Sequence, residues 1–378
     1  MSSRAEQLLT VGQSVWLDFI RRGPLVSGEF DRQVREDGVV GVTSNPTIFQ
    51  QAIAKSSDYD SALAERIARG LTGEALFESL AIEDIQMACD RLRAVYDRSG
   101  GMDGRVSIEV SPRLAHDGPG TLAAAKRLHA AVARPNVMIK IPATRAGLPA
   151  IASSIAAGIS VNVTLIFSLA RYREVMEAYL SGLEQLAAAR GDLGAVRSVA
   201  SFFVSRVDTK GDAAIDQRAA ALPASSPERA ELESLRGKAA VANARIAYAE
   251  FESVTASARF SALRARGAHV QRPLWASTST KNPSYRDVLY VEELVGPDTV
   301  NTMPPQTLVA FNDHGVVESR IRNDVAGARA LFARLPQLGV PIDSLIDQLE
   351  EEGVVSFAKS YDDLLGALDA RVKQMAAR

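Results

Sequence analysis

The segment VMIKIPAT, residues 137–144, places one lysine, Lys140, inside a short apolar run that ends at Pro142. A run of this length and composition is typical of a β-strand that is buried on both faces. A charged amine inside such a strand costs free energy unless it is paired, neutral or required for function. The segment therefore predicts a buried strand and a lysine whose role has to be explained.

Similar apolar or β-branched runs recur along the chain, with amphipathic helical patterns between them. The eight runs are 14–20, 38–44, 106–110, 137–143, 160–167, 198–207, 272–278 and 299–305, and the helical patterns include 61–99, 120–133, 148–158 and 169–190. Alternating strands and helices predict parallel pairing through right-handed crossovers. Eight such units favour a (β/α)8 TIM barrel of the α/β class over an open doubly wound sheet. The run 289–295 fits either a strand or a helix.

The chain has 378 residues, whereas a barrel of this kind typically needs about 250. Residues 212–270 are rich in Ala, Arg and Glu at helical spacing and predict a helical insertion outside the barrel. Residues 315–378 predict terminal helices with breaks between them. We therefore expect a single barrel domain over residues 1–378.

Composition indicates an ordinary globular protein, since 47% of the residues are hydrophobic and 23% are charged. The net charge of -2 gives no sign of a nucleic-acid surface, and no apolar run approaches the roughly 20 residues of a membrane helix. The first ten residues lack the apolar core of a leader, so we expect them in the mature protein. A single cysteine, Cys89, fits a reducing compartment, and we expect a cytoplasmic protein.

Two common nucleotide-binding loops are missing from the sequence. No G-x-G-x-x-G follows a predicted strand, and no G-x-x-x-x-G-K-[ST] occurs. The four histidines, His116, His129, His269 and His314, are scattered without metal-ligand spacing. We therefore expect no metal ion and no dinucleotide cofactor.

Polar residues near the ends of the predicted strands are the candidates for a site, because barrel enzymes place catalytic groups at the carboxyl ends of their strands. They are Asp18; Thr43, Ser44 and Asn45; Glu109; Lys140; Asn162 and Thr164; Ser201, Ser205 and Arg206; and Ser277, Thr278, Ser279 and Thr280. Each has a structural explanation when taken alone: Glu109 could pair with Lys140, and residues 277–280 could cap a helix beginning near Pro283. Polar residues at seven consecutive strands would be costly to bury without a purpose, and together they favour an active site.

The set makes chemical sense around Lys140. Burial disfavours a charged amine, and a neutral amine can attack a ketone and form a Schiff base. The protonated imine then accepts electrons when a neighbouring carbon–carbon bond breaks, a step that needs a base, and Asp18 and Glu109 are the available carboxylates. Arg206 and the Ser/Thr-rich turn after the seventh run suit a phosphate group.

With these residues in place, the sequence resembles the transaldolase family. The matching segments are GVTSNPTIF (41–49), VSIEVSPRLAHD (106–117), VMIKIPATRAG (137–147), GISVNVTLIFS (158–168), SFFVSRVD (201–208), WASTSTKNPSYRDVLYVEELVG (275–296) and TVNTMPPQTL (299–308). They follow the family order over roughly residues 10–315, and the long insertion after the sixth run is similar to the longer bacterial type. This family lies within the class I, Schiff-base-forming aldolase superfamily.

The resemblance implies a (β/α)8 barrel with a Schiff-base lysine on its fourth strand. It implies transfer of a dihydroxyacetone unit from sedoheptulose 7-phosphate to glyceraldehyde 3-phosphate, giving erythrose 4-phosphate and fructose 6-phosphate. This is a step of the non-oxidative pentose phosphate pathway. Sugar phosphates would be the only partners, without cofactor, metal, nucleic acid or membrane, and the protein would be a monomer or homodimer.

The resemblance also implies roles for individual residues. Lys140 would be the nucleophile, Asp18 the acid and base of cleavage, and Glu109 with Thr164 and a water the relay for Schiff-base formation. Substrate hydroxyls would meet Thr43, Asn45, Asn162 and Ser201, Phe203 would line the pocket, and Arg206 and Ser277 would hold the phosphate. The chain departs from shorter members of the family at Ser279, where they have an arginine, and Lys281 is the candidate to supply that charge.

Two other functions remain open on the residues alone. A class I aldolase acting on a related sugar phosphate would use the same imine and differ in whether water or an aldose ends the cycle. A barrel that only binds sugar phosphates is the other, and the carboxylates around Lys140 argue against it, since binding alone would not need them.

Overall fold

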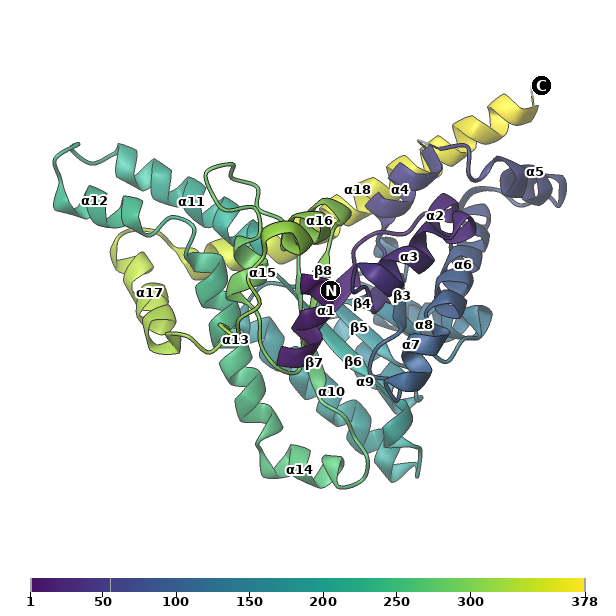
Figure 1. Ribbon diagram of the computed structural model, residues 1–378, viewed down its shortest axis with the longest axis horizontal. Helices are drawn as coiled ribbons and strands as arrows, with labels where there is room; N and C mark the ends of the chain where they lie inside the picture. The colour runs from purple at the N-terminus through teal and green to yellow at the C-terminus, as the bar shows by residue number, and fades with distance from the viewer. Residues whose placement is uncertain (1, 55, 377–378) are drawn as a thin grey trace.

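Eight parallel strands close into a barrel in sequence order in the computed structural model, which describes residues 2–54 and 56–376 (Figure 1). The strands are β1 (Gln13–Leu17), β2 (Gly41–Val42), β3 (Arg105–Glu109), β4 (Val137–Pro142), β5 (Val161–Ile166), β6 (Ser198–Phe203), β7 (Gln271–Ala276) and β8 (Thr299–Met303). Each predicted run overlaps one observed strand, and β1 pairs with β8 to close the cylinder. The prediction of a (β/α)8 barrel is confirmed.

Helices surround the barrel, and every connection between consecutive strands contains at least one. Their bounds are α1 (Arg4–Leu8), α2 (Arg22–Ser27), α3 (Glu29–Glu36), α4 (Pro46–Ala54), α5 (Asp60–Ala68), α6 (Gly73–Arg91), α7 (Arg93–Arg98), α8 (Gly118–Val132), α9 (Gly147–Ala156), α10 (Leu169–Ala188), α11 (Ser205–Ala220), α12 (Pro227–Ser234), α13 (Ala239–Thr255), α14 (Ala258–Arg264), α15 (Leu289–Glu293), α16 (Pro305–His314), α17 (Val325–Gln337) and α18 (Ile342–Ala376). Short 3-10 helices lie at Leu9–Val11, Pro112–Leu114 and Leu193–Ala195. Across the described ranges 2–54 and 56–376, none of these helices has the length and apolarity needed to cross a bilayer.

Several local predictions need correction. The long helical pattern over 61–99 is divided into α5, α6 and α7, and the ambiguous run 289–295 contains the helix α15. The helix expected near Pro283 is absent, since α15 begins only at Leu289 and an irregular loop precedes it. A tertiary contact holds this loop instead: Tyr285 Oη donates to Asp212 Oδ2 at 2.6 Å.

The region predicted as an insertion, 212–270, contains the end of α11 and then α12, α13 and α14. The predicted terminal helices of 315–378 correspond to α17 and α18. Residues 1, 55, 377 and 378 of the expected domain lie outside the described residues, and the division of the chain into a single domain stays a prediction.

Polar and aromatic side chains fill the end of the barrel where the strands begin. Arg272 Nη1 lies 3.3 Å from Asp103 Oδ1, and Arg272 Nη2 donates to Ser14 Oγ at 2.6 Å. Above them lies Trp16, and a Cβ atom on Gly41 would stand 2.5 Å from its indole ring, so only glycine fits there. The barrel is therefore solid at this end, which leaves the opposite end for a site.

The long helix α18 runs across the opposite end of the barrel and is the yellow helix in Figure 1. Its buried face repeats at roughly helical spacing and includes Ile346, Leu349, Gly353, Phe357, Tyr361, Leu364 and Leu368. Gly353 allows close packing, because a Cβ atom there would lie 3.0 Å from Leu165 Cδ2 of β5. The helix is thus seated on the ends of the strands that carry the polar candidates.

Candidate active site

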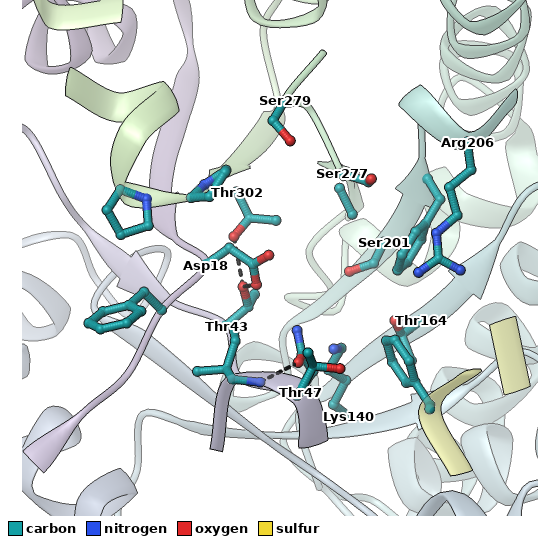
Figure 2. A pocket seen from close by; sticks show the side chains of 18 of the residues that line it. Asp18, Thr43, Thr47, Lys140, Thr164, Ser201, Arg206, Ser277, Ser279 and Thr302 are labelled. Carbon is teal, nitrogen blue, oxygen red and sulfur yellow. Dashed lines mark hydrogen bonds between the residues drawn. The ribbon is translucent and has the colours of Figure 1, made fainter. Parts of the chain in front are cut away.

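A cavity of about 490 Å³ opens at the carboxyl ends of the strands (Figure 2). Of the thirteen site residues predicted from the sequence, eleven line it: Asp18, Thr43, Asn45, Lys140, Thr164, Ser201, Phe203, Arg206, Ser277, Ser279 and Lys281. The other two are not among its lining residues: Glu109 lines a small neighbouring cavity, and Asn162 is fully buried. The closed barrel brings these residues together because equivalent strand ends meet at one rim.

Lys140 lies in β4 and only 4% of its surface is exposed. Its Nζ donates to Glu109 Oε2 at 3.0 Å and to the carbonyl oxygen of Ser44 at 3.0 Å. The ion pair considered as a structural explanation is therefore present. Lys140 also lines the cavity, however, so the amine can be reached by a molecule bound there.

Glu109 is the last residue of β3 and stands directly beside Lys140 in the strand register. Burial raises the pKa of Glu109, and the charge of Lys140 and its hydrogen bond partly offset that effect. A carboxyl group of this kind can exchange a proton with the amine over a hydrogen bond. Glu109 thus contacts the amine from a small neighbouring cavity that it lines together with Ser44 and Asn45.

Thr164 lies at an irregularity in β5. The register between β5 and β6 shifts between Val163 and Ile166, and Leu165 has a positive φ of 60°. The hydroxyl of Thr164 is buried at the cavity wall and has no hydrogen-bond partner among the described residues. Buried hydroxyls are usually paired, so Thr164 Oγ1 is available for a water molecule or a substrate group.

Asp18 follows β1 and lines the cavity on the side of Thr43 and Thr302, as Figure 2 shows. Thr43 Oγ1 donates to Asp18 Oδ1 at 2.8 Å and lies 2.7 Å from Thr302 Oγ1. Burial raises the pKa of the Asp18 carboxyl, although the charge of Lys140 opposes the shift. A raised pKa makes this carboxylate a better proton acceptor than an exposed aspartate.

The two asparagines differ in their surroundings. Asn45 lines the cavity, and its Oδ1 accepts a hydrogen bond of 2.9 Å from the backbone of Ile48 at the start of α4. Asn162 is fully buried, donates to Ser107 Oγ at 3.0 Å and accepts from Ser201 Oγ at 2.7 Å. Asn162 therefore orients the hydroxyl of Ser201, which lines the cavity, although Asn162 itself does not.

Figure 2 shows Arg206 across the cavity from Asp18 and Thr43, and Ser277 is labelled between them. Ser279 and Lys281 also line the cavity. Ser277 has a positive φ of 57°, and its Oγ lies 2.9 Å from Ser205 Oγ. Lys281 Nζ donates to Ser279 Oγ at 2.7 Å. Burial lowers the pKa of Lys281 and the charge of Arg206 lowers it further, while the charge of Asp18 opposes both effects.

Several lining residues were not among the candidates, notably Thr47, Thr302, Gln306 and Phe357. Thr302 is a polar residue in the eighth predicted run, and that signal was available in the sequence. Phe357 belongs to α18 and reaches the cavity only through the path of that helix. In the part of the chain that the structure describes, no three His, Cys, Asp or Glu residues are grouped so as to hold a metal ion.

Comparison with known proteins gives consistent matches along the chain. The sequence model of a family described as Transaldolase/Fructose-6-phosphate aldolase matches residues 15–368. Transaldolase 1 of Streptomyces coelicolor is 53% identical over 364 residues, covering 96% of this chain and 93% of its own. Transaldolases of Mycolicibacterium smegmatis and Thermobifida fusca are each 50% identical, over 97% and 100% of this chain and 98% and 100% of their own.

Proposed function

The chain belongs to the transaldolase/fructose-6-phosphate aldolase family, and from this premise we propose that it is a transaldolase acting through a Schiff base on Lys140. It takes a dihydroxyacetone unit from sedoheptulose 7-phosphate and gives it to glyceraldehyde 3-phosphate. The products are erythrose 4-phosphate and fructose 6-phosphate. The observation that carries this proposal is a buried lysine at the wall of a cavity whose other lining groups include Asp18 and Thr164.

Schiff-base formation is the first step. The Lys140 amine attacks the ketone carbon of the donor, and the carbinolamine loses water to leave a protonated imine. Glu109 Oε2 lies 3.0 Å from the amine, which supports a role in exchanging its protons. The hydroxyl of Thr164 has no hydrogen-bond partner among the described residues, which supports a water at that point of the relay. This division of roles stays a proposal.

Cleavage follows at the bond between C3 and C4 of the bound ketose. Asp18 takes the proton of the C4 hydroxyl, the bond breaks, and its electron pair moves toward the imine nitrogen to give an enamine. Erythrose 4-phosphate leaves. In the second half, C3 attacks the aldehyde carbon of glyceraldehyde 3-phosphate, Asp18 returns its proton to the new hydroxyl, and water releases fructose 6-phosphate from Lys140.

The reaction type is tested by following erythrose 4-phosphate from sedoheptulose 7-phosphate. We expect at most one equivalent per enzyme without an acceptor, and sustained release once glyceraldehyde 3-phosphate is added. Sustained release without an acceptor would instead identify an aldolase, the other activity in the description of the family. The cytoplasmic localisation and the oligomeric state, a monomer or homodimer, stay predictions.

We assign the phosphate of both substrates to Arg206, Ser277, Ser279 and Lys281, because all four line the cavity and two of them are cations. We expect Lys281→Ala to raise KM for glyceraldehyde 3-phosphate about tenfold, the cost of losing one charged hydrogen bond. KM for unphosphorylated glyceraldehyde should change little. Steady-state kinetics with both acceptors measure this, and Lys238→Ala, an exposed lysine outside the cavity, is the matched control. Equal changes for the two acceptors would remove Lys281 from the phosphate site.

A further inference from the structure

The helix α18 contributes one large side chain, Phe357, to the active-site cavity. The centre of its ring lies 5.5 Å from Lys140 Nζ, and the residue is only 6% exposed. The pale yellow ribbon of α18 passes beside Lys140 and Thr164 in Figure 2. Phe357 is therefore an aromatic side chain of the cavity wall that lies within cation–π distance of the amine that forms the imine.

Contacts on both sides of Phe357 hold α18 in place. Thr47 Oγ1 donates to Ser360 Oγ at 2.9 Å, and Tyr361 Oη donates to Glu74 Oε1 at 2.7 Å. Toward the beginning of the helix, Glu352 pairs with Lys210 of α11. Since the helix is fixed to α4, α6 and α11, the position of Phe357 does not depend on its own contacts alone.

The ring has two physical effects on a protonated imine at Lys140. A cation within about 6 Å of an aromatic centroid is attracted by the negative face of the ring. The same ring occupies space that water would fill, and excluding water protects a reactive intermediate from side reactions. The attraction acts on the protonated imine, which exists before cleavage and again after C3 has reacted. Only the exclusion of water acts on the neutral enamine that exists between donor cleavage and acceptor attack.

That intermediate, the enamine on Lys140, has two fates. In transfer, C3 forms a bond to the acceptor aldehyde carbon, and the proton on Asp18 goes to the aldehyde oxygen. In release, C3 takes a proton from Asp18 or from water, and water then adds to the imine carbon. The carbon–nitrogen bond breaks, and dihydroxyacetone leaves with the amine restored. Water beside the enamine therefore favours release of dihydroxyacetone over transfer to the acceptor.

We propose that Phe357 is a specificity-determining residue that keeps water from the Lys140 enamine and so directs the reaction toward transfer instead of release of dihydroxyacetone. This inference rests on the proposed function. Under this proposal, Phe357 of α18 decides whether an enzyme that forms this imine acts as a transferase or as an aldolase.

The test measures the ratio of dihydroxyacetone released to sedoheptulose 7-phosphate formed, with fructose 6-phosphate as donor and erythrose 4-phosphate as acceptor. We expect Phe357→Ala to raise this ratio about tenfold or more, the scale on which an apolar pocket discriminates. Phe357→Leu, which keeps an apolar side chain at the position, should restore most of the wild-type ratio. Thermal unfolding of each variant shows whether the fold persists.

The matched control is Leu364→Ala, on the same buried face of α18 but outside the cavity. Its ratio should stay within about twofold of the wild type, since it removes packing without opening the imine to water. An unchanged ratio in Phe357→Ala, or an equal shift in Leu364→Ala, would overturn the inference. Failure of the proposed function looks different, because borohydride would then trap no imine on Lys140 of the wild-type protein.

Discussion

Lys140→Ala should leave the protein unable to form a covalent adduct with its donor and should lower kcat by at least about ten-thousand-fold, as loss of a nucleophile does in other enzymes. The reason is chemical: among the described residues, Lys281 is the one lysine besides Lys140 that lines the cavity, and it is proposed to bind phosphate. Borohydride reduction in the presence of fructose 6-phosphate, followed by peptide mass mapping, measures the adduct. In the wild type the added mass should fall on the peptide that contains Lys140.

The structural explanation, a buried ion pair with Glu109, predicts something different. If Lys140 only neutralised Glu109, then Lys140→Arg would preserve the charge and much of the activity, although arginine cannot form the imine. We expect Lys140→Arg to be inactive as well. Lys126→Ala, an exposed lysine on α8, should behave as the wild type. Full activity in Lys140→Ala, or no added mass in the wild type, would refute the mechanism.

Asp18→Ala should separate the two halves of the chemistry. Its proposed role begins after the imine exists, so borohydride should still trap the adduct on Lys140 while turnover falls about a hundred- to ten-thousand-fold, the range of a lost acid–base group. Because burial raises the pKa of Asp18, the acidic limb of the wild-type kcat profile should lie above the range of a free aspartate. That limb should vanish from the residual activity of Asp18→Asn.

Thr43→Val gives a graded control for Asp18. It removes only the hydroxyl that donates to Asp18 Oδ1 at 2.8 Å, so it should lower kcat less than Asp18→Ala and leave the trapping intact. Loss of trapping in a folded Asp18→Ala protein would mean that Asp18 acts in Schiff-base formation, and its role would have to be reassigned.

The sequence predicted the barrel because its strands are buried on both faces and read as apolar runs that helical patterns separate. It also predicted most of the cavity wall, since residues at the carboxyl ends of barrel strands meet at one rim. The spacing of residues along the strands does not tell which of these side chains reach the cavity. Glu109 and Asn162 flank Lys140 in the strand register, yet neither lines the cavity that Lys140 lines.

Contacts between distant segments account for the remaining errors. The loop before α15 has the serine and proline of a helix start, but Tyr285 is held by Asp212 of α11, and no helix forms there. Phe357 lies in a helix with an ordinary amphipathic pattern, and nothing local to that pattern says that it crosses the barrel mouth. Its place follows from packing, in which Gly353 lets α18 approach β5 closely.

The position of α18 in the chain also bears on synthesis. The helix follows all eight strands in the sequence. The pairing of β1 with β8, which closes the barrel, therefore involves only residues that precede α18. A nascent chain emerging from the ribosome can therefore close its cylinder while one wall of its cavity has yet to be translated. Such a chain would hold Lys140 and its carboxylates in an open mouth, so the wall that Phe357 contributes is added only after the strands have been made.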